Sequence, residues 1–118
     1  MEKLDRNEWT NYFNDFNKRN QWRPTQLEVF GENGAQIAEC GLSFAGISLE
    51  RGNGSPAIEI MLGGPDATAS GRLTHVINNV QQIIPKRGQD GRDEALEIVG
   101  EHGEIRLLKF ETWPMIAN

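Results

Sequence analysis

The sequence predicts an α+β fold in which an N-terminal helix packs on a strongly curved antiparallel sheet of about six strands. Three observations support this prediction. An aromatic stripe at helical spacing lies near the amino end, and strand-like segments separated by glycine-containing turns follow it. In the longest of these segments the apolar residues change from even to odd positions, which indicates a sharp bend. Closure of the sheet into a small barrel is the alternative that such a bend leaves open.

Residues near the amino end predict the helix. Four aromatic rings fall at positions i, i+3, i+4 and i+7, which places them on one helical face. They belong to Trp9, Tyr12, Phe13 and Phe16. Asp5 and Glu8 have the spacing of a capping box, which predicts that the helix starts there, and Asn20 is its expected end. We expect the rings to dock the helix onto the sheet.

Residues 27–49 predict two strands joined by a tight turn. Apolar and polar residues alternate at the start of this stretch, and residues 31–34 are glycine-rich and suit a hairpin turn. In the return strand the apolar set changes parity after Gly46. Because side chains cannot change face without an extra residue, Ala45 and Gly46 are expected to form a bulge or bend.

Five further strands are expected in the rest of the chain. Two of them come from residues 73–84, whose apolar spacing also fits a helix but whose β-branched residues and central Asn78-Asn79 pair favour two short strands around a turn. The final pair, residues 95–99 and 105–110, forms a hairpin, and residues 57–62 form a strand before the loop at 63–72.

Length and charge limit the classes of function. A chain of 118 residues is expected to fold as a single domain over residues 1–118. The formal net charge of −5 argues against nonspecific nucleic-acid binding, which needs a concentrated basic surface. No apolar segment resembles a signal core or a membrane span, so we expect a soluble cytoplasmic protein without a membrane partner.

Cys40 is the single cysteine of the chain and lies within an apolar strand pattern. It cannot form an internal disulfide, and a reducing cytoplasm suits it. We expect it to be a buried structural thiol.

The sequence contains no complete catalytic or metal-binding motif. Residues 41–45 resemble a degenerate nucleophile elbow, but no helix follows to hold the serine. The two histidines, His75 and His102, have no second soft ligand beside them, so no metal site is expected. The carboxylates in residues 90–94 lack the ligand spacing of a calcium loop and suggest a solvated acidic turn. We therefore expect no enzyme activity and no cofactor.

The whole pattern resembles a family of small, uncharacterised bacterial proteins known only as a domain of unknown function. The resemblance covers nearly the full chain and implies one intact domain, and the family brings no established activity. It is carried by residues 5–9 with Tyr12, Phe13 and Phe16, residues 27–29 and 34–36, residues 46–48, residues 73–75, and residues 93–98 and 107–110.

A shorter resemblance is to PilZ domains, which bind cyclic di-GMP on a six-stranded barrel. Arg19 and Arg23 have the RxxxR spacing, and residues 41–46 resemble the [D/N]xSxxG strand of that family, although Gly41 replaces its acidic or amide residue. The resemblance implies a cyclic di-nucleotide site formed by Arg19, Arg23, Ser43 and Gly46. In that site the arginines would bind phosphates and stack on guanine.

The sequence as a whole predicts a non-catalytic binding or regulatory module that acts through protein contact, either with an unidentified protein partner or by self-association. Its candidate contact surfaces are the loop at 63–72 and an apolar carboxyl-terminal tail. The contact residues expected in that tail are Trp113, Met115 and Ile116. The alternative function is that of a PilZ-like domain binding cyclic di-GMP.

Overall fold

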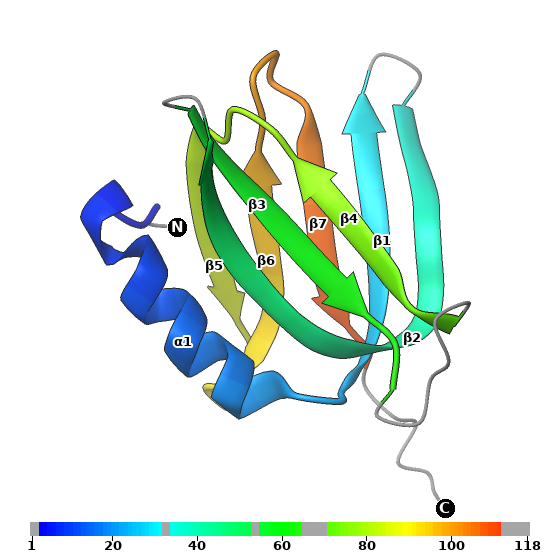
Figure 1. Ribbon diagram of the computed structural model, residues 1–118. Coiled ribbons are helices and arrows are strands. Elements are labelled where there is room, and N and C mark those ends of the chain that lie inside the picture. Colours follow the sequence, from blue (N-terminus) through cyan, green and yellow to red (C-terminus); the bar gives the residue numbers. More distant parts are fainter. Residues whose placement is uncertain (1–2, 32–33, 53–54, 65–70, 112–118) are drawn as a thin grey trace, which may run out of the picture.

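The structure is a computed structural model, and it describes residues 3–31, 34–52, 55–64 and 71–111 (Figure 1). A 3-10 turn, Arg6–Glu8, leads into one α-helix, α1, which spans Trp9–Asn20. Within the described residues seven strands follow, where a sheet of about six was expected. They are β1 Pro24–Gly31, β2 Gly34–Gly52, β3 Ser55–Leu62, β4 Leu73–Ile77, β5 Gln82–Arg87, β6 Asp93–Val99 and β7 Ile105–Phe110.

The seven strands form one antiparallel sheet in the order β4-β3-β2-β1-β7-β6-β5. The long strand β2 belongs to two layers, because its first half pairs with β1 and its second half pairs with β3 (Figure 1). Within the described residues the two edge strands, β4 and β5, do not pair with each other. The α+β prediction is confirmed, and the sheet is curved but open, so the small-barrel alternative is wrong.

The expected bend in β2 is present. The register with β3 shifts between Phe44 and Gly46, which makes Ala45 the extra residue of a bulge. A second irregularity lies near Gly41, whose φ of 85° is left-handed, and the pairing with β1 shifts there by one residue. Together these two points allow one strand to serve both layers.

The second irregularity explains why the prediction for Cys40 is wrong. Cys40 is exposed and pairs with Gln26, with its Sγ 3.9 Å from the Gln26 Oε1 atom and 3.8 Å from Glu111 Oε2. The extra residue after Cys40 reverses the side-chain alternation. Phe44 therefore points into the core although both residues occupy even positions.

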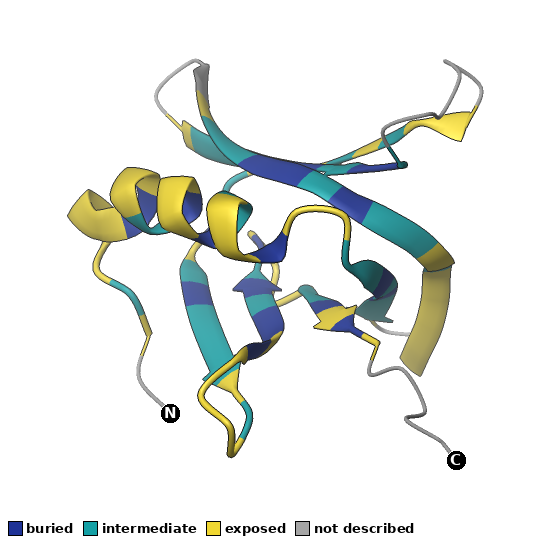
Figure 2. Cartoon of the chain, turned by 90° about the horizontal axis from the view of Figure 1, so that it is seen from below, coloured by how far each residue is buried: buried dark blue, intermediate teal, exposed yellow. Residues whose placement is uncertain are grey.

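The aromatic stripe docks the helix onto the sheet, as predicted. Figure 2 shows α1 lying between the two layers of the curved sheet. The rings of Trp9, Phe13 and Phe16 are buried, and Tyr12 is half-buried beside them. The Phe16 ring lies 5.5 Å from that of Phe44 and 5.6 Å from that of Phe110, centroid to centroid. Such pairs contribute about 0.5–1.5 kcal/mol each beyond the burial of area.

Polar contacts fix the position of α1 along β2. The Asn17 side chain accepts a hydrogen bond from the Ile47 backbone N–H at 2.9 Å and donates one to the Ile47 carbonyl at 3.0 Å. The predicted capping box does not form, because Asp5 makes no side-chain cap and the 3-10 turn precedes the helix. The segment before the turn instead joins the sheet edge, where the Leu4 N–H donates to the Ile83 carbonyl.

Residues 73–84 form two strands, which confirms the choice made against a helix. Asn79, in the turn between them, adopts a left-handed φ of 51° that asparagine tolerates. The adjacent Val80 is fully buried, and its N–H donates to the Pro56 carbonyl. In the part of the chain that the structure describes, no helix has the length and apolar character needed to cross a membrane.

Candidate functional site

The candidate site lies where the carboxyl end of α1 meets the turn between β5 and β6. Arg19 and Asn20 occupy the last turn of the helix, and Trp22 then adopts a left-handed φ of 70°. This sharp turn is fixed by a hydrogen bond from the Trp22 N–H to the Phe44 carbonyl and another from the Arg23 N–H to the Asn20 carbonyl. The chain thereby returns Arg23 to the end of the helix.

The facing turn brings two more arginines to the same place. It is closed by a hydrogen bond from the Gly88 N–H to the Arg92 carbonyl at 2.9 Å, and Gly91 has a left-handed φ of 80°. The Asp90 carboxylate accepts the Arg92 backbone N–H at 3.0 Å, which stiffens the turn further. Arg87 and Arg92 consequently flank the start of β6.

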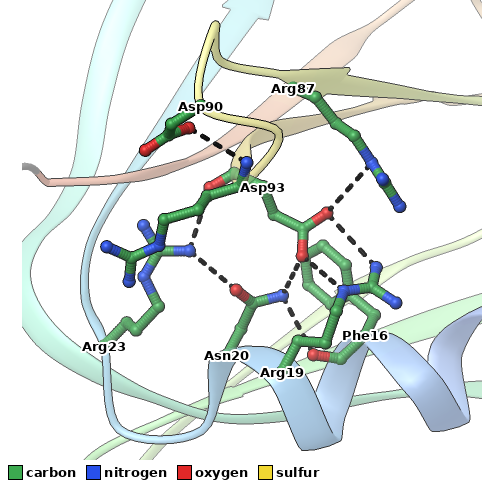
Figure 3. A network of polar contacts seen from close by, with 8 residues as sticks. Phe16, Arg19, Asn20, Arg23, Arg87, Asp90 and Asp93 are labelled. Carbon is green, nitrogen blue, oxygen red and sulfur yellow. Dashed lines mark hydrogen bonds and ion pairs between the residues drawn. The ribbon is translucent and has the colours of Figure 1, made fainter.

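Asp93 is the centre of the contact network (Figure 3). Its side chain is only 4% exposed, whereas that of Arg19 is 39% exposed. Arg19 donates to both carboxylate oxygens, from Nε to Oδ2 at 2.8 Å and from Nη2 to Oδ1 at 3.2 Å. The Asn20 amide donates to Oδ2 at 2.8 Å. A bidentate guanidinium and an amide thus satisfy the buried carboxylate.

These contacts decide the charge of Asp93. Burial by itself raises the pKa of a carboxyl group, but the hydrogen bonds from Arg19 and Asn20 and the charges of Arg19 and Arg87 outweigh burial here. The pKa of Asp93 is therefore lower than its ordinary value, and Asp93 is ionised at neutral pH. The same hydrogen bond is the main reason why the pKa of Arg19 is raised.

Arg23 is held by neutral acceptors. Its Nη1 donates to the Asn20 side-chain oxygen at 2.7 Å and to the Asp93 backbone carbonyl at 2.9 Å. Its guanidinium carbon lies 4.3 Å from the centroid of the Phe110 ring, a cation–π contact. Burial, followed by the charge of Arg92, lowers the pKa of Arg23, although the guanidinium stays protonated.

The other two guanidinium groups are less engaged. The Arg87 Nε atom lies 3.9 Å from Asp93 Oδ1, which is an ion pair beyond hydrogen-bond distance. The Arg92 side chain forms no hydrogen bond or ion pair with any residue that the structure describes. The network therefore has more positive charge than its one buried carboxylate neutralises.

Two adjoining open pockets surround this network. We call the first the arginine pocket; its volume is about 300 Å3, and it is lined by Arg19, Asn20, Arg23, Arg87, Gly91, Arg92 and Asp93. We call the second the Phe110 pocket; its volume is about 510 Å3, and it is lined by Arg23, Gly88, Gln89, Asp90, Arg92, Asp93, Glu94 and Phe110. Both volumes fall in the range of small-molecule sites.

Comparison with known proteins gives the family of the chain. The sequence profile of DUF5335, a family of unknown function, matches residues 1–117. The chain belongs to the DUF5335 family. No curated protein and no solved structure matches it. The PilZ resemblance gains nothing from these comparisons and rests on its short motifs alone.

Only two of the four residues of the predicted cyclic di-GMP site line a pocket of the candidate site. Arg19 and Arg23 line the arginine pocket together, whereas Ser43 and Gly46 line neither pocket. Ser43 pairs with Pro24 across β1 and β2, and its carbonyl accepts the Gly63 N–H. Gly46 is covered by the helix and β3, so that a Cβ atom there would meet Met61 Cε at 3.5 Å and Asn17 Oδ1 at 3.9 Å.

Other sequence predictions have mixed outcomes in this DUF5335 domain. Trp113, Met115 and Ile116, together with residues 65–70 of the expected contact loop, lie outside the described residues. Among the residues that are described, no group of three or more metal-ligating side chains comes together. His102 is exposed beside Glu101, whereas His75 is half-buried and accepts a hydrogen bond from Arg106.

Sequence reasoning missed the centre of the site. The interpretation of residues 90–94 as a solvated turn is wrong for Asp93, which is buried. Arg87 and Arg92 are exposed and line the arginine pocket, and no motif in the sequence pointed to either of them. The available signal was Asp93 at the start of an apolar strand, with Arg87 and Arg92 shortly before it. A carboxylate in that place needs a cationic partner if it is buried.

Proposed function

We propose that this domain is a non-catalytic binding module that recognises an anionic group in the arginine pocket. One observation carries the proposal: four arginines line a pocket whose buried carboxylate is already matched by Arg19 and Asn20. The guanidinium groups of Arg23, Arg87 and Arg92 have no carboxylate within hydrogen-bond distance in the described part of the chain. Guanidinium groups in such a cluster recognise carboxylate and phosphate oxygens.

The contrast with the rest of the protein strengthens this proposal. The chain carries a net charge of −5, so a cluster with surplus positive charge runs against the overall balance. A purely structural role would need only Arg19, Asn20 and Arg23, which fasten the end of α1 to β6. Arg92 adds no contact to that fastening, although its charge lowers the pKa of Arg23. An anion bound between these groups would remove the repulsion.

The test is a calorimetric titration at low ionic strength with phosphate and sulfate as probes. We expect saturable binding to the intact protein and about tenfold weaker binding in Arg92→Gln, because one charge-assisted contact is lost. Lys18→Gln is the matched control, since Lys18 is exposed on α1, lines neither pocket and carries the same charge. Absence of binding, or equal weakening in both variants, would contradict the proposal.

Cyclic di-GMP belongs in the same titration, because Arg19 and Arg23 line one pocket. If it binds as the PilZ resemblance implies, Arg23→Ala and Ser43→Ala should both weaken it. Loss in Arg23→Ala alone would assign its phosphate to the arginine pocket without the second motif. A flat titration with the intact protein would end this alternative.

Self-association is the second candidate function. The strand β4 pairs only with β3 in the described residues, which leaves its other edge available to an added strand. Val76 on this strand is 46% exposed. Sedimentation analysis should show a dimer that dissociates in Val76→Lys, and deletion of residues 113–118 would test the tail separately. A monomer at high concentration would exclude both surfaces as contacts between copies.

A further inference from the structure

We infer that the anionic group is the phosphate of a monoester whose organic part carries hydroxyl or ammonium groups. The inference rests on the proposed function of the arginine pocket and names the class of ligand. It is carried by the Phe110 pocket, which shares Arg23, Arg92 and Asp93 with the arginine pocket and has two further carboxylates in its lining, those of Asp90 and Glu94.

The arginine pocket is suited to a group with two negative charges. Its lining contains four guanidinium groups against the single carboxylate of Asp93. A carboxylate ligand or a phosphodiester would bring one charge to this surplus, whereas a phosphate monoester brings about −1.5 to −2 at pH 7 and three acceptor oxygens. Guanidinium forks also match phosphate oxygens geometrically. The monoester is thus the better complement to the pocket.

The Gly88 end of the Phe110 pocket carries carboxylates. A Cβ atom placed on Gly88 would meet Asp90 Oδ1 at 3.2 Å and Glu94 Oε2 at 3.3 Å, so both carboxylates converge over this glycine. Gln89 lies in the same wall. A carboxylate accepts hydrogen bonds and repels a second anion. This end therefore favours a neutral or cationic group with N–H or O–H donors.

The two ends fix the direction of the ligand. Arg23 and Arg92 lie in both linings. The charge of Arg92 lowers the pKa of Arg23, and the charge of Asp90 raises it. A phosphate held by these arginines would direct its ester group into the larger pocket of about 510 Å3. Inorganic phosphate would leave that pocket unused. Sugar phosphates and phosphorylated amino alcohols share the required chemistry.

Four probes separate these possibilities by calorimetry: ribose 5-phosphate, phosphoethanolamine, ethyl phosphate and inorganic phosphate. Ethyl phosphate has the same charged group as the first two but no donors on its organic part. We expect at least one donor-bearing monoester to bind about tenfold more tightly than ethyl phosphate, because it gains hydrogen bonds to the carboxylates. Which of the two is tighter distinguishes a hydroxylated ligand from an amine.

A double variant tests the carboxylate end directly. In Asp90→Asn with Glu94→Gln, the preferred monoester should fall to the affinity of ethyl phosphate, while ethyl phosphate itself should bind equally or more tightly after the loss of two negative charges. Arg92→Gln should instead weaken all four probes by a similar factor. Asparagine can still accept the Arg92 N–H, so the turn is expected to remain folded.

A pH series tests the charge of the bound group. The second ionisation of a monoester has a pKa near 6, so affinity should fall about tenfold between pH 7.5 and pH 5. Sulfate keeps its charge over this range, and its affinity should stay constant. The charged groups that face the phosphate site are those of Arg19, Arg23, Arg87, Arg92 and Asp93, together with the Asp90 and Glu94 carboxylates of the adjoining pocket. No histidine of the described residues lines either pocket.

The outcomes distinguish this inference from the proposed function. Equal affinity for ethyl phosphate, inorganic phosphate and the donor-bearing monoesters would overturn the ligand class and leave anion recognition standing. Unchanged discrimination in the double variant would also overturn it, because the carboxylates would then have no role. If none of the four probes binds, both the inference and the proposed function fail.

Discussion

Two arginine sites in this domain differ in what their guanidinium groups face. In the arginine pocket, Arg19 forms a bidentate pair with the buried carboxylate of Asp93. Within the curved sheet, Arg106 of β7 instead donates from Nε to the Nε2 atom of His75 on β4 at 3.2 Å. The Arg106 Nη1 atom is buried and has no hydrogen-bond partner among the described residues.

The comparison shows what a carboxylate partner changes. Arg19 and Asn20 keep Asp93 ionised in spite of its burial, and the site can then carry further arginines at its surface. At the second site, burial and then the charge of Arg106 lower the pKa of His75, although Glu39 opposes them. Arg106 thus has a neutral partner and holds the layers together inside the fold. The first three experiments below test this difference, and the fourth tests the exposed position of Cys40.

The largest effect is expected from Asp93→Ala. Removal of the carboxylate leaves Arg19 and Asn20 without their acceptor next to a buried position. We expect a loss of about 2–3 kcal/mol in the free energy of unfolding, below the full cost of a broken buried pair because Arg19 is partly exposed. Urea denaturation measures it. Glu101→Ala, at an exposed turn, is the control and should change stability by less than about 0.5 kcal/mol.

Low pH should remove the contribution that ionised Asp93 makes to the free energy of unfolding. Because the pKa of Asp93 is lower in the folded protein than in the unfolded chain, its stabilising effect is complete above the ordinary carboxyl value and is lost as pH falls through the folded value. The stability difference between the natural protein and Asp93→Asn should therefore shrink between pH 7 and about pH 3. A difference that stays constant over this range would show that the charge of Asp93 is not what stabilises the site.

His75 should give a smaller effect in a different pH window. Its pKa in the folded protein is lower than the ordinary value, so the unfolded chain binds a proton first as pH falls. Stability should accordingly rise with pH between the folded pKa and about 6.5. His75→Gln, which keeps an acceptor for Arg106, should reduce this slope in thermal or urea unfolding. An undiminished slope would place its origin elsewhere.

Cys40→Ser should have the smallest effect. Because Cys40 is exposed on the outer face of β2, the substitution should change stability by less than about 0.5 kcal/mol. The native thiol should also react with a thiol-specific reagent at a rate close to that of the unfolded chain. Slow reaction or marked destabilisation would support the buried position that the sequence pattern suggested.

Local patterns predicted most of the fold. The spacing of Trp9, Phe13 and Phe16 identified the buried face of α1, and the parity change beside Gly46 located the bulge in β2. The same kind of reasoning failed at Cys40, because the left-handed glycine that follows it adds a residue without changing the polarity of its neighbours. A single hidden bulge is enough to reverse an inside-outside assignment.

The candidate site could be predicted only in part. Arg19 and Arg23 were singled out by their spacing, and the structure brings both to one pocket. Their partner Asp93 lies on a strand 74 residues after Arg19 and 70 residues after Arg23, and the pairing depends on how α1 crosses the end of β6. The spacing of residues along the chain does not predict such a long-range contact. An aspartate beside a basic segment is recognised as part of a site only when the fold shows that it is buried and which arginines it contacts.

The most direct test of anion recognition is a nitrogen-labelled NMR titration of the intact protein with inorganic phosphate. We expect saturable chemical-shift changes centred on the backbone amides of Gly88, Gly91, Arg92 and Asp93. The affinity for phosphate obtained from these changes should be about tenfold weaker in Arg92→Gln and unchanged in Lys18→Gln. Shifts that are linear in phosphate concentration, or that are spread over the surface away from these amides, would contradict the account.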